Sequence, residues 1–130
     1  MRGSALQEFE QRLNKLFDQI DEELEERWGG AYPLHPSRSE RGETGNPEFD
    51  GLFNIGASFS AGYGSEHGKG YVIEVRMVTL TRVDPEQREQ IQQEAADRVD
   101  ALLPVYFPGR ALEVVRDGNL YKITGDFSLS

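Results

Sequence analysis

The sequence predicts an α+β fold in which two helices pack on one face of a four-stranded, mainly antiparallel sheet, in the order α-β-β-α-β-β. Apolar residues recur at three- and four-residue spacings over 5–27, which predicts an amphipathic helix, and at alternate positions over 53–63 and 71–77, which predicts strands. The pair Asp117-Gly118, between two further alternating runs, predicts a β-hairpin. Each strand has one apolar face, which is typical of an antiparallel sheet covered on one side. We expect residues 1–130 to form a single domain.

The first helix is expected over residues 5–27, with Ser4 as its N-cap and Gly29-Gly30 at its end. Its apolar stripe consists of Leu6, Phe9, Leu13, Leu16, Phe17, Ile20 and Leu24. A coiled-coil pattern lapses at Glu23 and Arg27, so we expect the stripe to pack on the sheet. The carboxylates beside the stripe are interpreted as a solvated face: Asp21, Glu22, Glu25 and Glu26.

Residues 29–51 are rich in glycine and proline and predict a long irregular loop. Its polarity predicts that residues 36–47 are mobile, with a protease cutting first after Arg38 or Arg41. The alternative is an ordered loop that serves as a lid over a ligand site.

The second helix is expected to begin with Asp84 as its N-cap and Pro85 at its first position, and to be closed by Pro104 and Pro108-Gly109. Strand orders 2-1-3-4 and 1-2-4-3 are both fully antiparallel, and the sequence leaves both open. The predicted sheet core consists of Phe53, Ile55, Phe59, Tyr71, Ile73, Val75, Leu112, Val114, Tyr121 and Ile123.

The C-terminal hairpin is expected to turn on Asp117 and Gly118 as its two central residues. That register places Val115 opposite Leu120 and Glu113 opposite Lys122, the latter as a pair of opposite charges. It also places Val114 opposite Tyr121 and Leu112 opposite Ile123, all on one apolar face.

The net charge of −9 is concentrated in the predicted helices. Residues 1–27 carry eight acids against four bases, which argues against binding to nucleic acid. The 37% apolar share is that of a soluble protein, and no run approaches the roughly 20 apolar residues of a membrane span. We therefore expect a cytoplasmic protein without membrane contact. The chain has no cysteine, which excludes disulfides and thiolate metal sites.

No catalytic motif is present. The glycines around Lys69 miss the phosphate-loop spacing because Tyr63 stands where a glycine is required. His35 and His67 belong to no metal-ligand pattern, and no Gly-x-Ser-x-Gly nucleophile elbow occurs. The sequence thus predicts no catalytic residue, metal or cofactor and favours a protein that is not an enzyme.

The favoured function is a non-enzymatic protein-interaction or self-associating module, with a homodimer as the expected assembly. Its interface would be the outward sheet face, at Val72, Arg76, Val115, Leu120 and Lys122. The alternative is a small-molecule binder or small enzyme with a pocket near the 29–51 loop. Such a pocket would use the aromatic and histidine side chains Trp28, Tyr32, His35, His67 and Tyr106.

Overall fold

The computed structural model describes residues 2–47, 49–65 and 67–127. It contains two helices and a four-stranded antiparallel sheet in the order α-β-β-α-β-β, so the predicted fold class is confirmed. The elements are α1 (Arg2–Trp28), β1 (Phe53–Ser60), β2 (Gly70–Met77), α2 (Pro85–Tyr106), β3 (Leu112–Asp117) and β4 (Leu120–Gly125). Ser4 lies inside α1 and is not its N-cap, because the helix begins at Arg2, three residues earlier than expected.

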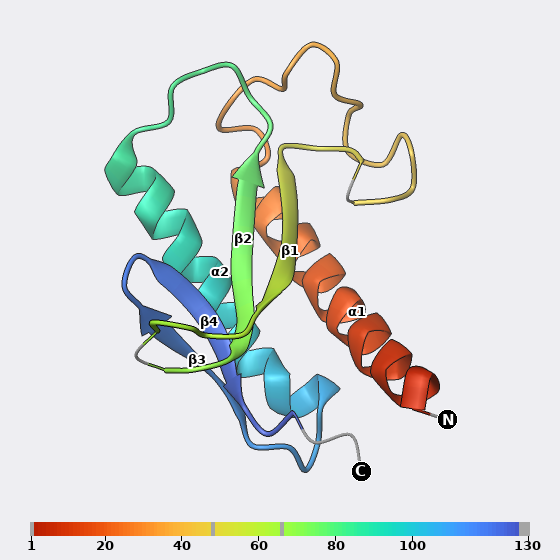
Figure 1. Ribbon diagram of the computed structural model, residues 1–130. Coiled ribbons are helices and arrows are strands. Elements are labelled where there is room, and N and C mark those ends of the chain that lie inside the picture. The colour runs from red at the N-terminus through yellow and green to blue at the C-terminus, as the bar shows by residue number, and fades with distance from the viewer. Residues whose placement is uncertain (1, 48, 66, 128–130) are drawn as a thin grey trace.

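The strand order is β1-β2-β4-β3, the second of the two orders that the sequence left open. β4 pairs with β2 through Tyr71 opposite Ile123 and Val72 opposite Lys122. Figure 1 shows the sheet as one layer with both helices behind it. α1 slants past the β1 edge, and α2 crosses behind the β3–β4 hairpin. β1 and β3 are therefore the two edges of the sheet.

The core lies between the sheet and the helices. Of the predicted sheet core, Phe53, Tyr71, Ile73, Tyr121 and Ile123 are buried, and Ile55, Val75, Leu112 and Val114 are half-buried against them. Phe59 is 58% exposed, so its prediction as a core residue was wrong. Its ring lies edge-on to Tyr71, with centroids 5.5 Å apart, near the end of the edge strand. A position at a sheet edge has neighbours on one side only, and alternation in sequence does not reveal this.

The C-terminal hairpin has a register different from the predicted one. Asp117 pairs with Leu120, so the central turn residues are Gly118 and Asn119. Gly118 has a φ of +63°, and a glycine with positive φ at the first central position is typical of a type II′ turn. Each partner shifts by two residues, which preserves the faces but replaces the predicted pairs. Glu113 lies opposite Thr124, and its predicted charge pair with Lys122 does not form.

α2 begins as predicted, because the Asp84 side chain accepts a hydrogen bond from the Glu86 N–H at 2.8 Å. The helix nevertheless continues beyond Pro104 to Tyr106. The last turn is held by Phe107, whose N–H donates to the Leu103 carbonyl at 2.8 Å and whose side chain is buried. Burial of this turn outweighs the hydrogen bond that proline removes.

Candidate functional site

The edge of β1 exposes backbone hydrogen-bonding groups. In an antiparallel ladder, alternate residues direct both their N–H and C=O groups to the neighbouring strand, and the residues between them direct both groups away. The Val78 N–H donates to the Leu52 carbonyl at 2.7 Å, in the register that pairs β1 with β2. The backbone groups of Ile55, Ala57 and Phe59 therefore point away from β2, toward the free edge.

The first residue of β1 confirms this phase. The Arg38 guanidinium donates to the Phe53 carbonyl at 3.0 Å from outside the sheet. The Glu25 carboxylate accepts hydrogen bonds from the N–H groups of Leu52, at 2.9 Å, and Phe53, at 3.4 Å. Gly51 makes this approach possible, since its φ is +75° and a Cβ there would lie 2.7 Å from the Glu25 carboxylate. The edge is thus capped at Phe53. No described group bonds the backbone N–H and C=O groups of Ile55, Ala57 and Phe59.

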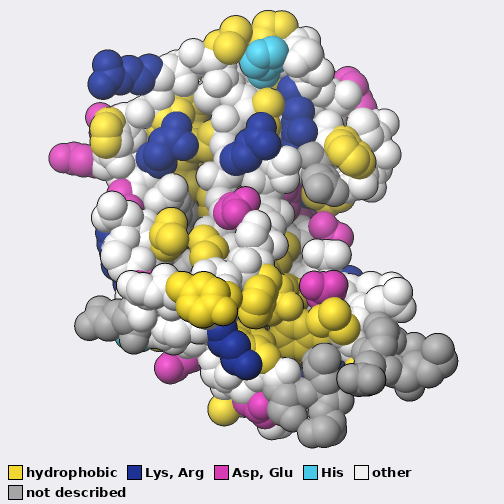
Figure 2. Space-filling model, viewed as in Figure 1, with side chains coloured by type: hydrophobic (Ala, Val, Ile, Leu, Met, Phe, Trp, Pro, Cys, Tyr) yellow, Lys and Arg dark blue, Asp and Glu magenta, His cyan; other side chains and the backbone are white. Residues whose placement is uncertain are grey.

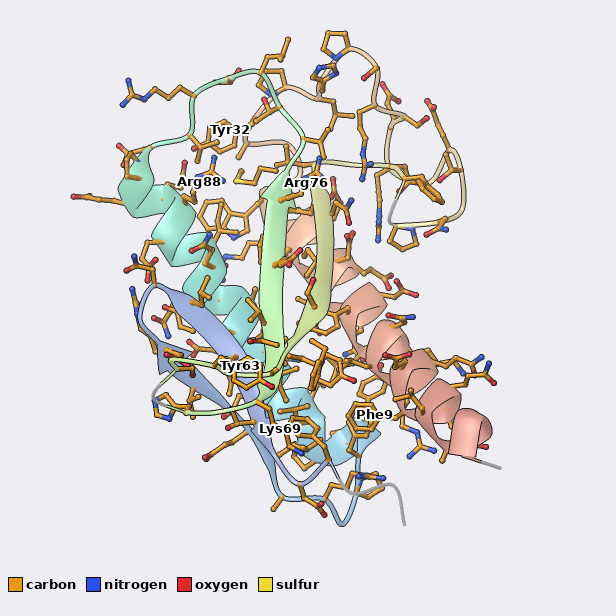
Figure 3. The ribbon with its side chains drawn as sticks, in the orientation of Figure 1. Phe9, Tyr32, Tyr63, Lys69, Arg76 and Arg88 are labelled. Carbon is orange, nitrogen blue, oxygen red and sulfur yellow. The ribbon has the colours of Figure 1, made fainter. Side chains whose placement is uncertain are left out.

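A cavity of about 530 Å³ lies along this open edge, between α1 and β1. We call it the β1 groove. Its lining consists of Asn14, Phe17, Asp18 and Asp21 from α1, Asn46 from the loop, Asn54, Ile55, Gly56 and Ala57 from β1, and Glu74 and Arg76 from β2. Carboxylates outnumber the single arginine in this lining. Figure 3 shows Arg76 near the upper end of β2.

Buried charges fix the loop above the groove. Asp21 and Asp50 are 2% and 1% exposed, and Arg41 lies 2.8 Å from the Oδ1 of Asp21 and 3.4 Å from the Oδ1 of Asp50. Asp50 also accepts hydrogen bonds from the Gly42 N–H at 3.1 Å and from the Thr44 hydroxyl at 2.8 Å. We call these five residues the loop cluster.

The predicted mobility of residues 36–47 does not agree with these contacts. Arg41 bonds the buried carboxylates, and Arg38 donates to three backbone carbonyls of the segment 50–53. Both arginines expected as protease sites are therefore held in place. The prediction was made from polarity, and polarity does not distinguish a solvated loop from one whose polar groups bond each other.

The two buried carboxylates have opposite electrostatic environments. Burial raises the pKa of Asp21 to about 7, against the attraction of Arg41 and with added repulsion from Glu25. Burial also opposes ionisation of Asp50, but hydrogen bonds from Thr44 and Gly42 hold the pKa of that carboxyl below its usual value. Near neutral pH, Asp50 is ionised while Asp21 is close to its midpoint.

The prediction that Asp21 and Glu25 belong to a solvated face was wrong. Asp21 is buried, and Glu25 is half-buried over the start of β1. A signal was available, because Asp21 is four residues after Phe17 and three before Leu24, on the stripe that faces the sheet. The run of acids around it concealed this position.

The five residues predicted to bind a ligand do not meet in one cavity of the described structure. The Trp28 indole donates to Glu94 at 2.7 Å, and Tyr32 bonds Gln87, so both join the end of α1 to α2. His35 lies in the loop after α1, with its Nδ1 2.7 Å from the Ser37 hydroxyl and its backbone N–H bonded to the Val78 carbonyl.

The other two members lie elsewhere. Tyr106 bonds Gln19 in the middle of α1. His67 is exposed in the loop between β1 and β2. Tyr63 and Lys69 of that loop lie at the opposite end of the sheet from Tyr32 (Figure 3). The aromatic side chains thus connect elements, and no described site unites them with the histidines.

The predicted interface on the outward sheet face is only partly accessible. Arg76 and Leu120 are exposed, and Val72 and Val115 are half-buried. Lys122 is 2% exposed, which contradicts its place on an open face.

The loop between β1 and β2 covers Lys122. The Nζ of Lys122 donates to the carboxylate of Asp117, the hydroxyl of Ser65 and the carbonyl of Gly68, each at 2.9 Å. Hydrogen bonds from Lys122 and Ser65 lower the pKa of Asp117 to about 2. Figure 2 shows that apolar side chains on this face gather in its lower half, around the end of β1 and the following loop.

Two features are absent from the described residues. No three histidine, cysteine, aspartate or glutamate side chains among them are placed to hold a metal ion. No helix among them is long and apolar enough to cross a membrane.

The fold defines a small α+β domain with a half-covered antiparallel sheet. A family model described as "Uncharacterised protein" matches residues 4–125. A protein of Borreliella burgdorferi (strain ATCC 35210 / DSM 4680 / CIP 102532 / B31), described as "Uncharacterized protein", is 39% identical over 127 residues, which are 98% of this chain and 99% of that protein. The chain belongs to this uncharacterised family. No solved structure matches it.

Proposed function

We propose that the protein is a non-enzymatic interaction module that binds an extended polypeptide as a fifth strand on the β1 edge. The observation that carries this proposal is the run of unpaired backbone groups at Ile55, Ala57 and Phe59 beside the β1 groove. An added strand bonds such an edge through its main chain, and the groove selects its side chains. Each backbone hydrogen bond contributes about 0.5–1.5 kcal/mol.

The surroundings of the edge favour a single added strand as the partner rather than a second sheet. α1 extends past β1 on the inner side, where it forms the other wall of the groove (Figure 1). A single extended segment fits between the helix and the edge, whereas a second sheet would bring its own helix layer against α1. Homodimer formation through the outward face and a cytoplasmic location complete the proposal and rest on the sequence.

A small-molecule ligand in the β1 groove is the second candidate. Its volume of about 530 Å³ lies within the range of roughly 300–1,000 Å³ found for ligand pockets. The loop residue Asn46 lines it, as expected of a pocket near residues 29–51.

The test is selection of random octapeptides on the parent protein, with counter-selection on Ala57→Pro. Proline removes the outward N–H of residue 57 and is tolerated at an edge strand where that group bonds nothing. The control is Ala57→Ser, which retains the N–H and adds little volume to the groove. We expect enriched peptides that bind the parent and the serine variant and lose binding to the proline variant. Absence of enrichment, or equal binding to Ala57→Pro, would refute the strand-addition function and leave the small-molecule candidate.

A further inference from the structure

We infer that the strand bound at β1 is basic, with a Lys or Arg side chain on its inner face that lies between Asp18 and Asp21. This inference rests on the proposed function and names the chemistry of its ligand. The partner is thus a polypeptide segment that carries lysine or arginine among residues able to extend as a strand.

The face of the added strand follows from the pleat. A residue opposite Ala57 shares the side of the sheet on which Ala57 lies, which is the side covered by α1. Directly opposed residues have Cβ atoms about 4.5–5.5 Å apart, so this side chain enters the groove beside the small Ala57. Asp18 and Asp21 line the helix wall there.

The charges of the groove are complementary to a cation. Asp18, Asp21 and Glu74 contribute carboxylates, and Arg76 contributes the opposing charge. Glu74 accepts a hydrogen bond from Ser58 at 2.7 Å on the outer face. The polar remainder consists of the amides of Asn14, Asn46 and Asn54, which can accept hydrogen bonds from an ammonium or guanidinium group.

Asp21 retains an acceptor for the ligand. Arg41 bonds its Oδ1 at 2.8 Å. No donor in the described part of the chain bonds the Oδ2 of Asp21. Every fully buried polar side-chain atom of the described residues has a hydrogen-bond partner, so this Oδ2 is not fully buried. Because Asp21 also lines the β1 groove, the Oδ2 is the oxygen that a ligand cation reaches.

The experiment uses three N-acetylated, C-amidated octapeptides that alternate threonine with lysine, glutamine or glutamate. Binding to the full chain is measured by NMR titration of backbone amide signals, using Ile55, Ala57 and Phe59 in the parent and Ile55 and Phe59 in Ala57→Pro. We expect the lysine peptide to bind most tightly and the glutamate peptide most weakly. Asp18→Asn should weaken the lysine peptide about two- to fivefold and leave the glutamine peptide unchanged, as expected for one partly solvated charge pair.

Glu22→Gln is the matched control, since it removes an exposed acid of α1 that does not line the groove. It should leave all three affinities unchanged. Equal binding of the lysine and glutamine peptides, with both lost in Ala57→Pro, would overturn the basic ligand and retain strand addition. A lysine preference that survives both Asp18→Asn and Asp21→Asn would also overturn it. Lysine-peptide binding that is indifferent to Ala57→Pro would instead refute the proposed function.

Discussion

The two edges of the sheet differ in how far their outward backbone groups are hydrogen-bonded. At β3, the N–H of Val114 donates to the Asp100 carboxylate of α2 at 3.0 Å, and the N–H of Leu112 donates to the Arg110 carbonyl at 3.1 Å. At β1, the cap consists of Glu25 and Arg38 and ends at Phe53. The outward groups of the next three alternate residues face a groove.

Proteins commonly cover or charge the edges of their sheets, because an open edge invites pairing with another chain. Here the helix that crosses behind β3 supplies a carboxylate to that edge, whereas the helix beside β1 lines a cavity along it. The difference indicates that β1 is the edge available to a partner.

Asp50→Ala should remove the cap from the β1 edge by releasing the loop. It leaves Arg41 with one carboxylate and takes the acceptor from Gly42 and Thr44, and removal of one partner of a buried pair costs about 3–5 kcal/mol. Urea denaturation should show this loss, and trypsin should cut after Arg38 and Arg41 only in the variant. Glu43→Ala, an exposed acid of the same loop, is the control and should change neither property.

Asp21→Asn should change how stability depends on pH. Folding raises the pKa of Asp21 from 3.8 to about 7, so the folded state binds the proton more tightly. The stabilisation that protonated Asp21 provides is therefore present below about pH 4 and is lost as the pH rises to about 7. From pH 4 to pH 8, the free energy of unfolding of the parent, relative to the asparagine variant, should fall by on the order of 4 kcal/mol. A constant difference across this range would contradict the assignment.

Asp100→Ala should open the β3 edge. Loss of the acceptor for Val114 should cost about 0.5–1.5 kcal/mol and accelerate hydrogen exchange at that amide. The amides of Ile55, Ala57 and Phe59 should exchange rapidly in both proteins, because the structure gives them no described acceptor. Asp97→Ala provides the control, since Asp97 accepts a hydrogen bond from Gln93 and no described hydrogen bond joins its side chain to β3. Slow hydrogen exchange at the Ala57 amide in the parent would contradict the claim that the β1 edge is open.

Leu120→Glu should have the smallest effect on stability, within about 0.5 kcal/mol, because Leu120 is 49% exposed. It tests whether a dimer forms through the outward sheet face, since a charge in an interface core opposes association. Sedimentation at micromolar concentration should show a dimeric parent and a monomeric variant. A monomeric parent would exclude this dimer, and a dimeric variant would locate the interface elsewhere, including the β1 edge.

Much of the fold could be predicted from local pattern. The alternation in β2 and the cap at Asp84 each depend on neighbours in sequence, and the structure confirms both. The hairpin turn was misplaced by one residue, because Asp117-Gly118 and Gly118-Asn119 are both acceptable turn pairs and both registers keep the same residues on the apolar face.

The candidate site could not be predicted in the same way. It depends on which strand forms an edge, and that follows from the strand order, which the sequence left open. The loop cluster joins residues 21, 41 and 50, whose contact requires the folded loop. Asp21 alone had a readable position, on the apolar stripe of α1, but a carboxylate on such a stripe does not show which group it will meet.

The enclosure of Lys122 makes the rate of its chemical modification a measure of local opening. Lys15 and Lys69 are exposed and should be acylated at once by a water-soluble amine reagent, whereas the Lys122 ammonium is shielded by three acceptors. It can be modified only when the loop over β4 opens. The rate at which mass spectrometry finds a label on residue 122 would therefore report how often the tips of the two hairpins separate.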